Sequence, residues 1–167
     1  TWVNESKNFG FGHARLSILD TSSAGNQPMV SNSKRYVISF NGEIYNHLKL
    51  REELLNEQFS INFKSGSDTE TLLYCFESWS INKTLEKLVG MFSFALYDTI
   101  ENKLFLARDR FGEKPLYYGL QNNNLFFSSE LKAIVANSNF KKEICTLALS
   151  NYFNLSYIPS PLTIYNS

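Results

Sequence analysis

Residues 91–97, Met-Phe-Ser-Phe-Ala-Leu-Tyr, form an almost unbroken apolar run, which constrains the fold more than any other stretch of the chain. A strand with one face in water alternates apolar and polar residues, so a continuous run indicates a strand that is covered on both faces. Residues 98–102 are expected to turn the chain back into a second apolar arm at 103–108. The pattern predicts an antiparallel sheet with further layers packed against it.

Other segments extend this sheet and supply its helical cover. Alternation or short apolar runs predict strands at residues 14–20, 36–40, 61–63, 116–118 and 125–129. Helical spacing of apolar residues predicts helices at residues 46–57, 67–80, 84–89, 130–136 and 146–153. Strands joined as hairpins, with helices at intervals, are typical of α+β proteins in which helices pack outside antiparallel sheets.

A polar segment follows the strand predicted at 36–40. Asn41, Gly42 and Glu43 bring a side-chain amide, a glycine N–H and a carboxylate close together where that strand is expected to end. This combination suits a small, polar, charged ligand. Asn-Gly is also a strong signal for a tight hairpin turn, because both residues tolerate positive φ angles. The residues alone leave both interpretations open.

Two charged residues elsewhere have ordinary structural interpretations. Ser67 and Glu70 have the spacing of a capping box, which predicts a helix that begins there with Asp68 in its first turn. Taken alone, Asp68 would do no more than stabilise that helix start. Arg15 lies among apolar neighbours, where a side chain that snorkels at the rim of a sheet is the common arrangement.

The composition argues against several classes of function. The chain has 167 residues and a formal net charge of zero, so nothing favours binding to nucleic acid or to an anionic membrane surface. The pairs Cys75/Cys145 and His13/His47 lack the spacing of a metal site or a disulfide framework. No apolar run reaches membrane-spanning length. We therefore expect a cytoplasmic protein without nucleic-acid or membrane partners.

Seven segments, in order along almost the whole chain, resemble one family of enzymes. The family is the glutaminase domain of asparagine synthetases, which are class II glutamine amidotransferases. A single matching segment would be weak evidence, whereas seven in family order are specific. The segments are residues 12–20 (Gly-His-Ala-Arg-Leu-Ser-Ile-Leu-Asp), 25–29 (Gly-Asn-Gln-Pro-Met), 40–46 (Phe-Asn-Gly-Glu-Ile-Tyr-Asn), 67–70 (Ser-Asp-Thr-Glu), 90–95 (Gly-Met-Phe-Ser-Phe-Ala), 107–118 and 128–133 (Ser-Ser-Glu-Leu-Lys-Ala).

The resemblance implies a fold and a domain organisation. It implies the α+β fold of N-terminal-nucleophile hydrolases, a four-layer αββα sandwich with two antiparallel sheets. Residues 1–153 would form the amidotransferase domain, and residues 154–167 would lead into a C-terminal synthetase domain. No cofactor is expected in residues 1–153, whereas ATP and Mg²⁺ would belong to the synthetase domain. The resemblance leaves open a homodimer of the full-length protein.

The resemblance also assigns residues to the binding of L-glutamine. The guanidinium of Arg15 would hold the α-carboxylate, a task that suits its planar pair of donors. Glu43 and Asp68 would receive the α-ammonium group. The Asn41 side chain and the Gly42 N–H would form the oxyanion hole. The pocket would also be lined by the segment Leu16, Ser17, Ile18 and Leu19, with the Leu16 side chain under the ligand.

One family feature has no counterpart in this sequence. The family nucleophile is a Cys at the first position of the mature chain, and its own α-amino group acts as the base. Here position 1 is Thr1, and the first matched element follows at residues 12–20, whereas the family has several dozen residues between the two. We therefore expect this chain to lack the nucleophile and the first strand, and to be inactive as a glutaminase by itself.

Two other functions stay open at this point. A related amidotransferase with another acceptor would share the same glutamine-binding segments, because the acceptor is chosen by a different domain. A non-catalytic protein that binds glutamine or a similar amino acid would also keep these residues without the nucleophile.

Overall fold

The computed structural model describes residues 1–15, 22–57 and 61–166, and it divides into two compact units, Thr1–Pro115 and Leu116–Ser167. The first unit is built on a four-stranded antiparallel sheet in the order β3–β4–β5–β6. These strands span Met29–Val30 (β3), Tyr36–Ile44 (β4), Gly90–Asp98 (β5) and Lys103–Arg108 (β6). The predicted hairpin is confirmed, since β5 and β6 pair from Asp98↔Lys103 to Ser93↔Arg108.

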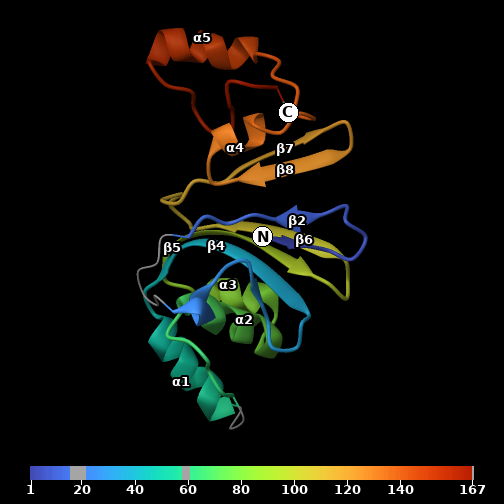
Figure 1. The fold of residues 1–167 in the computed structure, drawn as a ribbon. Coiled ribbons are helices and arrows are strands. Elements are labelled where there is room, and N and C mark those ends of the chain that lie inside the picture. The colour runs from blue at the N-terminus through green and yellow to red at the C-terminus, as the bar shows by residue number, and fades with distance from the viewer. Residues whose placement is uncertain (16–21, 58–60, 167) are drawn as a thin grey trace. The chain divides into compact units, whose positions relative to one another are not determined.

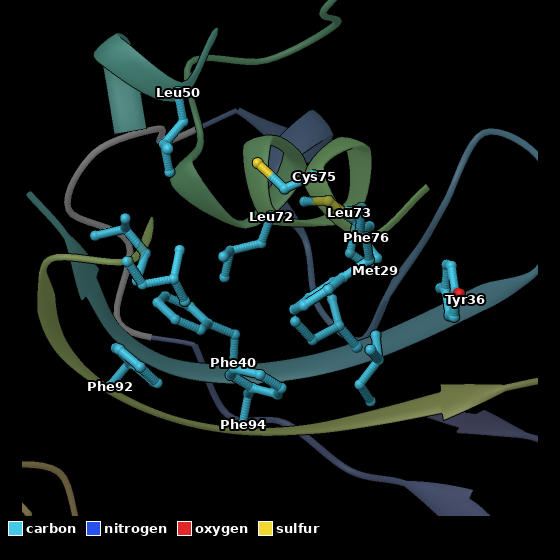
Figure 2. Packing of buried hydrophobic residues seen from close by; sticks show 14 of the residues in the cluster. Met29, Tyr36, Phe40, Leu50, Leu72, Leu73, Cys75, Phe76, Phe92 and Phe94 are labelled. Atoms are coloured by element: carbon cyan, nitrogen blue, oxygen red, sulfur yellow. The ribbon is translucent and has the colours of Figure 1, made fainter. Parts of the chain in front are cut away.

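Three helices cover one face of this sheet: α1 (His47–Glu57), α2 (Asp68–Ser78) and α3 (Ile81–Lys87). Figure 2 shows Leu72 and Phe76 of α2 directed at the strand residues Phe40 and Phe94. The rings of Phe76 and Phe94 lie 5.6 Å apart, centroid to centroid. Burial of each such side chain contributes roughly 2 kcal/mol, so this layer supplies much of the stability of the unit.

The opposite face of the sheet carries a short hairpin, formed by β1 (Trp2–Val3) and β2 (Gly10–Phe11). The rings of Trp2 and Phe9 pack on Tyr97, at centroid distances of 5.6 and 4.9 Å. Tyr97 and Phe94 are three residues apart on one strand and therefore point to opposite faces. The sheet is thus covered on both sides, as the unbroken apolar run of β5 predicts.

Three details of the predicted secondary structure are wrong. Strand β4 does not end at Asn41-Gly42, and no hairpin turn forms there, because its pairing with β5 continues from Phe40↔Phe94 to Ile44↔Gly90. Residues 61–63 form no strand. Residues 14–15 are not in a strand either, and the rest of the strand predicted at 14–20 lies outside the described residues.

The predicted helices are present with shifted bounds. Helix α3 begins at Ile81 because the Ser80 side chain caps it, accepting from the N–H of Lys83. The Ser67 cap of α2 is confirmed, since its hydroxyl accepts from the N–H of Thr69. The second interaction of the predicted capping box, between the Glu70 side chain and the Ser67 N–H, does not form. The Glu70 carboxylate accepts from the N–H groups of Lys64 and Ser65, and it holds the incoming loop instead of closing back on Ser67.

The second unit has a core of its own. It contains the hairpin of β7 (Tyr117–Gln121) and β8 (Asn124–Ser128), followed by α4 (Leu131–Val135) and α5 (Thr146–Leu155). Phe126, Ile134 and Phe140 are buried together, and Tyr165 packs edge-on against Phe140. The α+β class with antiparallel sheets is confirmed. The domain boundary between 153 and 154 stays a prediction. No helix within the described ranges is long and apolar enough to span a bilayer.

Candidate functional site

The free edge of β4 is the centre of the candidate site. In the described part of the chain, β3 pairs only with Val37 and Ile38, so the later residues of β4 have no strand beside them on that edge. Two side chains take the place of a strand there. The Gln27 Oε1 atom accepts from the Phe40 N–H at 2.6 Å, and the Asp68 Oδ2 atom accepts from the Ile44 N–H at 2.9 Å.

The Gly42 N–H lies between these two capped positions. Phe92, the residue opposite Gly42, uses its own N–H and C=O on the far side of β5, where both bond to Asp109. Gly42 and Phe92 are therefore a non-hydrogen-bonded pair, and the Gly42 N–H points to the same free edge as those of Phe40 and Ile44. Within the described ranges no group accepts a hydrogen bond from it.

Position 42 requires glycine. The φ angle of Gly42 is +155°, and a Cβ atom there would lie 2.2 Å from the Met91 carbonyl oxygen. Across the pair of strands, a Cβ atom at Gly90 would lie 2.2 Å from the Glu43 carbonyl oxygen. The two backbones approach closely at this point, which holds the Gly42 amide in a fixed direction.

The Asn41 side chain lies on the face of the sheet away from the helices. Strand alternation places it on the same side as Ser39, whose hydroxyl is 3.1 Å from the His13 Nδ1 atom. Asn41 and its neighbour Glu43 are both half-buried. The amide of Asn41 and the N–H of Gly42 are thus consecutive groups at the start of the free edge.

Asp68 is the buried carboxylate of the site, with 4% of its surface exposed. It is the first residue of α2, where the helix dipole favours a negative charge. Burial raises the pKa of Asp68 above its usual value, and the Ile44 N–H and His47 offset this only in part. Its bond to Ile44 shows that Asp68 joins α2 to the end of β4, beyond any role in starting the helix.

Arg15 lies against the loop of residues 22–28. A Cβ atom added to Gly25 would lie 2.5 Å from the Arg15 Nη2 atom, so the guanidinium rests on this glycine. Its Nη1 atom donates to the Ser22 carbonyl oxygen at 3.5 Å. Gly25 ends the short 3-10 helix η1 (Ser23–Gly25), two residues before Gln27. The same loop therefore positions Arg15 and caps the edge of β4.

The predicted site residues are thus distributed over one sheet edge and its surroundings. Asn41, Gly42 and Glu43 belong to β4, with Asp68 bonded to their strand and Arg15 held on the adjoining loop. Leu16, Ser17, Ile18 and Leu19 lie outside the described residues. Sequence reasoning gave no role to Gln27, which the structure places on the Phe40 N–H. Its presence in the segment 25–29 was the one signal that pointed to it.

Neither cysteine belongs to this edge. Cys75 is fully buried in the helical layer, and burial raises the pKa of its thiol to about 12. Cys145 precedes α5 in the second unit. Across residues 1–15, 22–57 and 61–166 no group of three His, Cys, Asp or Glu side chains is placed to hold a metal ion. The absence of a cofactor from this domain stays a prediction.

Comparisons with known proteins agree with the family resemblance that the sequence segments indicate. The family model described as "Glutamine amidotransferase domain" matches residues 1–167. Asparagine synthetase [glutamine-hydrolyzing] 1 of Bacillus subtilis is 41% identical over 93% of this chain and 24% of that protein. Asparagine synthetase B [glutamine-hydrolyzing] of Escherichia coli is 40% identical over 80% of this chain and 23% of that protein.

A relative in Methanocaldococcus jannaschii, a putative asparagine synthetase [glutamine-hydrolyzing] 2, is 37% identical over 95% of this chain and 33% of that protein. The chain therefore spans between 23% and 33% of the length of these three relatives. Among solved structures, glutamine phosphoribosylpyrophosphate amidotransferase from B. subtilis matches with a TM-score of 0.62 and 25% identity. That match covers 74% of this chain and 28% of the solved one.

Proposed function

Because the chain belongs to the family of glutamine amidotransferase domains, we propose that it forms the glutamine site of a glutamine-hydrolysing asparagine synthetase. The family predicted from seven sequence segments is confirmed. The acceptor is the finer part of the proposal. Its support is that the relatives near 40% identity are named asparagine synthetases, whereas the solved amidotransferase that acts with another substrate is 25% identical.

The direction of the Gly42 N–H, toward the edge of β4 away from β5, is the observation that carries the proposal. An amide carbon under attack becomes tetrahedral, and its oxygen gains negative charge. A backbone N–H that is fixed by its strand stabilises that charge without reorganising, by roughly 3 kcal/mol in comparable sites. In this proposal the carboxamide of glutamine lies along the edge of β4, with its oxygen between the Gly42 N–H and the Asn41 side-chain amide.

The charged groups around this edge suit the other end of the ligand. Glutamine carries an ammonium group and a carboxylate on one carbon atom. Asp68 and Glu43 would bind the ammonium group, and Arg15 would bind the carboxylate through its paired donors. The Asp68 carboxylate accepts from the backbone N–H groups of Ile44 and Thr69. A carboxylate has about four acceptor sites, so it can receive the ammonium group as well. An ammonium group beside this buried carboxyl would favour its ionised form.

In a complete enzyme of this kind, a cysteine thiolate attacks the carboxamide carbon and ammonia leaves. Water then hydrolyses the γ-glutamyl thioester to glutamate. The ammonia would reach an aspartate activated with ATP and Mg²⁺ in a synthetase domain. The thiol of Cys75 is too deeply buried for the first step. We therefore propose that these 167 residues bind glutamine without hydrolysing it. A cytoplasmic location and the homodimer stay predictions.

A ligand series with matched variants tests the proposal. Glutamine, 4-aminobutanamide (no α-carboxylate) and glutaramic acid (no amine) would be titrated into the wild type and Arg15→Ala. Removing either charged group should weaken binding to the wild type about tenfold or more. In Arg15→Ala, removing the carboxylate from the ligand should no longer reduce the affinity. Removing the amine from the ligand should still reduce it. Equal effects of both deletions in the variant would contradict the role of Arg15.

A further inference from the structure

His47 occupies a place in the site that the family resemblance does not assign. It is the first residue of α1, three positions after Ile44, whose N–H is held by Asp68. One helical turn later Arg51 lies on the same face of α1. Its Nε donates to the Thr71 Oγ1 atom at 2.7 Å, and its Nη2 donates to the Ser67 carbonyl oxygen at 2.8 Å. This face of α1 therefore lies against the start of α2, where Asp68 is.

The imidazole of His47 has an unusual environment. Its Nδ1 atom is buried, and no atom of the described part of the chain forms a hydrogen bond with it. Such atoms are rare in folded proteins and call for a reason. Three charged groups act electrostatically on the ring: Asp68 from α2, Arg51 from its own helix and Glu43 from β4.

These groups act on the ring in opposite directions. Burial lowers the pKa of His47, Arg51 lowers it further, and the carboxylates of Asp68 and Glu43 only partly oppose this. A positive charge at the first residue of a helix is also disfavoured by the helix dipole. The ring is therefore neutral at neutral pH, and both carboxylates are left to the cation of a ligand.

Resting on the proposed glutamine site, we propose that His47 is a positioning residue of that site, and that its imidazole must be neutral for Asp68 and Glu43 to hold the α-ammonium group. A protonated ring would place a second cation beside the same two carboxylates. It would repel the ammonium group and compete for its acceptors. Glutamine binding below the pKa of His47 must then release a proton, so the affinity falls as the pH falls.

The experiment is glutamine calorimetry on the full chain at pH 8.0 and pH 5.5, with far-UV circular dichroism to show that it stays folded at both. The quantity compared is the ratio of the two dissociation constants, so a change in absolute affinity does not matter. We expect the wild-type ratio to exceed that of His47→Gln and to stay below about ten, the value that an unshifted histidine pKa of about 6.5 would give. For His47→Gln, which cannot titrate in this range, we expect a smaller ratio, because the titration of Asp68 is left and that of His47 is removed.

His13→Gln is the matched control, because His13 is the other histidine of the chain; it bonds to Ser39 on the face of the sheet away from α1 and α2, the face that also carries Asn41. It should keep the wild-type ratio. The same variant leaves His47 as the one histidine signal in a proton NMR titration, in which saturating glutamine should lower its pKa. An unchanged ratio in His47→Gln, or a His47 pKa that glutamine does not move, would overturn the inference. Failure of the wild type to bind glutamine at pH 8.0 would overturn the proposed function and this inference with it.

Discussion

Single residues determine the shape of the β4 edge, and Gly42 is the one that tolerates least change. Its φ angle of +155° is disfavoured for any residue with a Cβ atom, and that atom would collide with the Met91 carbonyl oxygen at 2.2 Å. Neither strand can move away cheaply, because the pairing of β4 with β5 continues for two residues on the C-terminal side of Gly42, to Ile44↔Gly90.

We predict that Gly42→Ala lowers the free energy of unfolding by about 2 kcal/mol or more. Gly66→Ala is the control, because a Cβ atom at Gly66 meets nothing within 4 Å, and it should change the free energy by less than about 0.5 kcal/mol. Urea unfolding followed by circular dichroism measures both. A Gly42→Ala chain as stable as the control would mean that the strands relax, and the fixed direction of the Gly42 N–H would be lost as an argument.

The residue scale also shows what a sequence can reveal of a site. The segment 41–43 indicates an amide, a glycine and a carboxylate close together, and Ser67 predicts the start of a helix. Both signals are local in the sequence. The bond between Asp68 and Ile44 joins positions 24 apart in the chain, and no local pattern encodes it. Gln27 was missed for the same reason. Its partner Phe40 is 13 residues away, and an amide in a polar loop has no distinguishing spacing.

At the scale of elements, the loop after β6 is organised by one carboxylate. The Asp109 Oδ1 atom accepts from the N–H groups of Phe111 and Glu113, and the Oδ2 atom accepts from those of Phe92 and Lys114. Burial by itself would raise the pKa of Asp109, but the four backbone N–H groups outweigh burial and lower it. Asp109 therefore connects this loop to β5, opposite Gly42.

We predict that Asp109→Asn lowers the free energy of unfolding at pH 7 by about 2 kcal/mol, because its NH₂ group would face two backbone donors. The pKa of Asp109 is lower in the folded chain than in the unfolded chain. Its contribution is therefore present above the usual aspartate pKa of about 3.9 and is lost as the pH falls through the folded value.

The difference between Asp109→Asn and the wild type should accordingly shrink from pH 7 to pH 3, as measured by urea unfolding. Glu113→Gln is the control, because it removes an exposed carboxylate from the same loop, and it should change the stability little at either pH. A difference that stays constant with pH would show that the charge of Asp109 does not hold the loop.

Elements also differ in how well the sequence predicts them. The β5–β6 hairpin follows from its own residues, because two-sided burial leaves a continuous apolar run and the turn is close in sequence. Strand β4 continues through Asn41-Gly42 for a reason that lies 50 residues away, in the backbone of β5. Non-local pairing overrides a local turn signal there. The hydrogen-bond partners of Glu70 were missed because they lie in the loop before the helix, where the N–H groups of Lys64 and Ser65 donate to its carboxylate.

At the scale of the whole molecule, every described residue of the proposed glutamine site belongs to the first compact unit, Thr1–Pro115. The unit holds the edge of β4, the loop of residues 22–28, the start of α2 and His47. Glutamine binding can therefore be tested on this chain, although the chain spans only about a quarter to a third of the length of these relatives.

The central claim is that this edge binds glutamine through the buried carboxylate of Asp68, and calorimetry with L-glutamine at pH 8 tests it most directly. We expect saturable binding by the wild type and by Glu52→Gln, which removes an exposed carboxylate from α1. Asp68→Asn, folded by circular dichroism, should bind at least about tenfold more weakly, because it leaves the ammonium group without its buried partner. Equal affinity in all three proteins, or no binding by a folded wild type, would contradict the account.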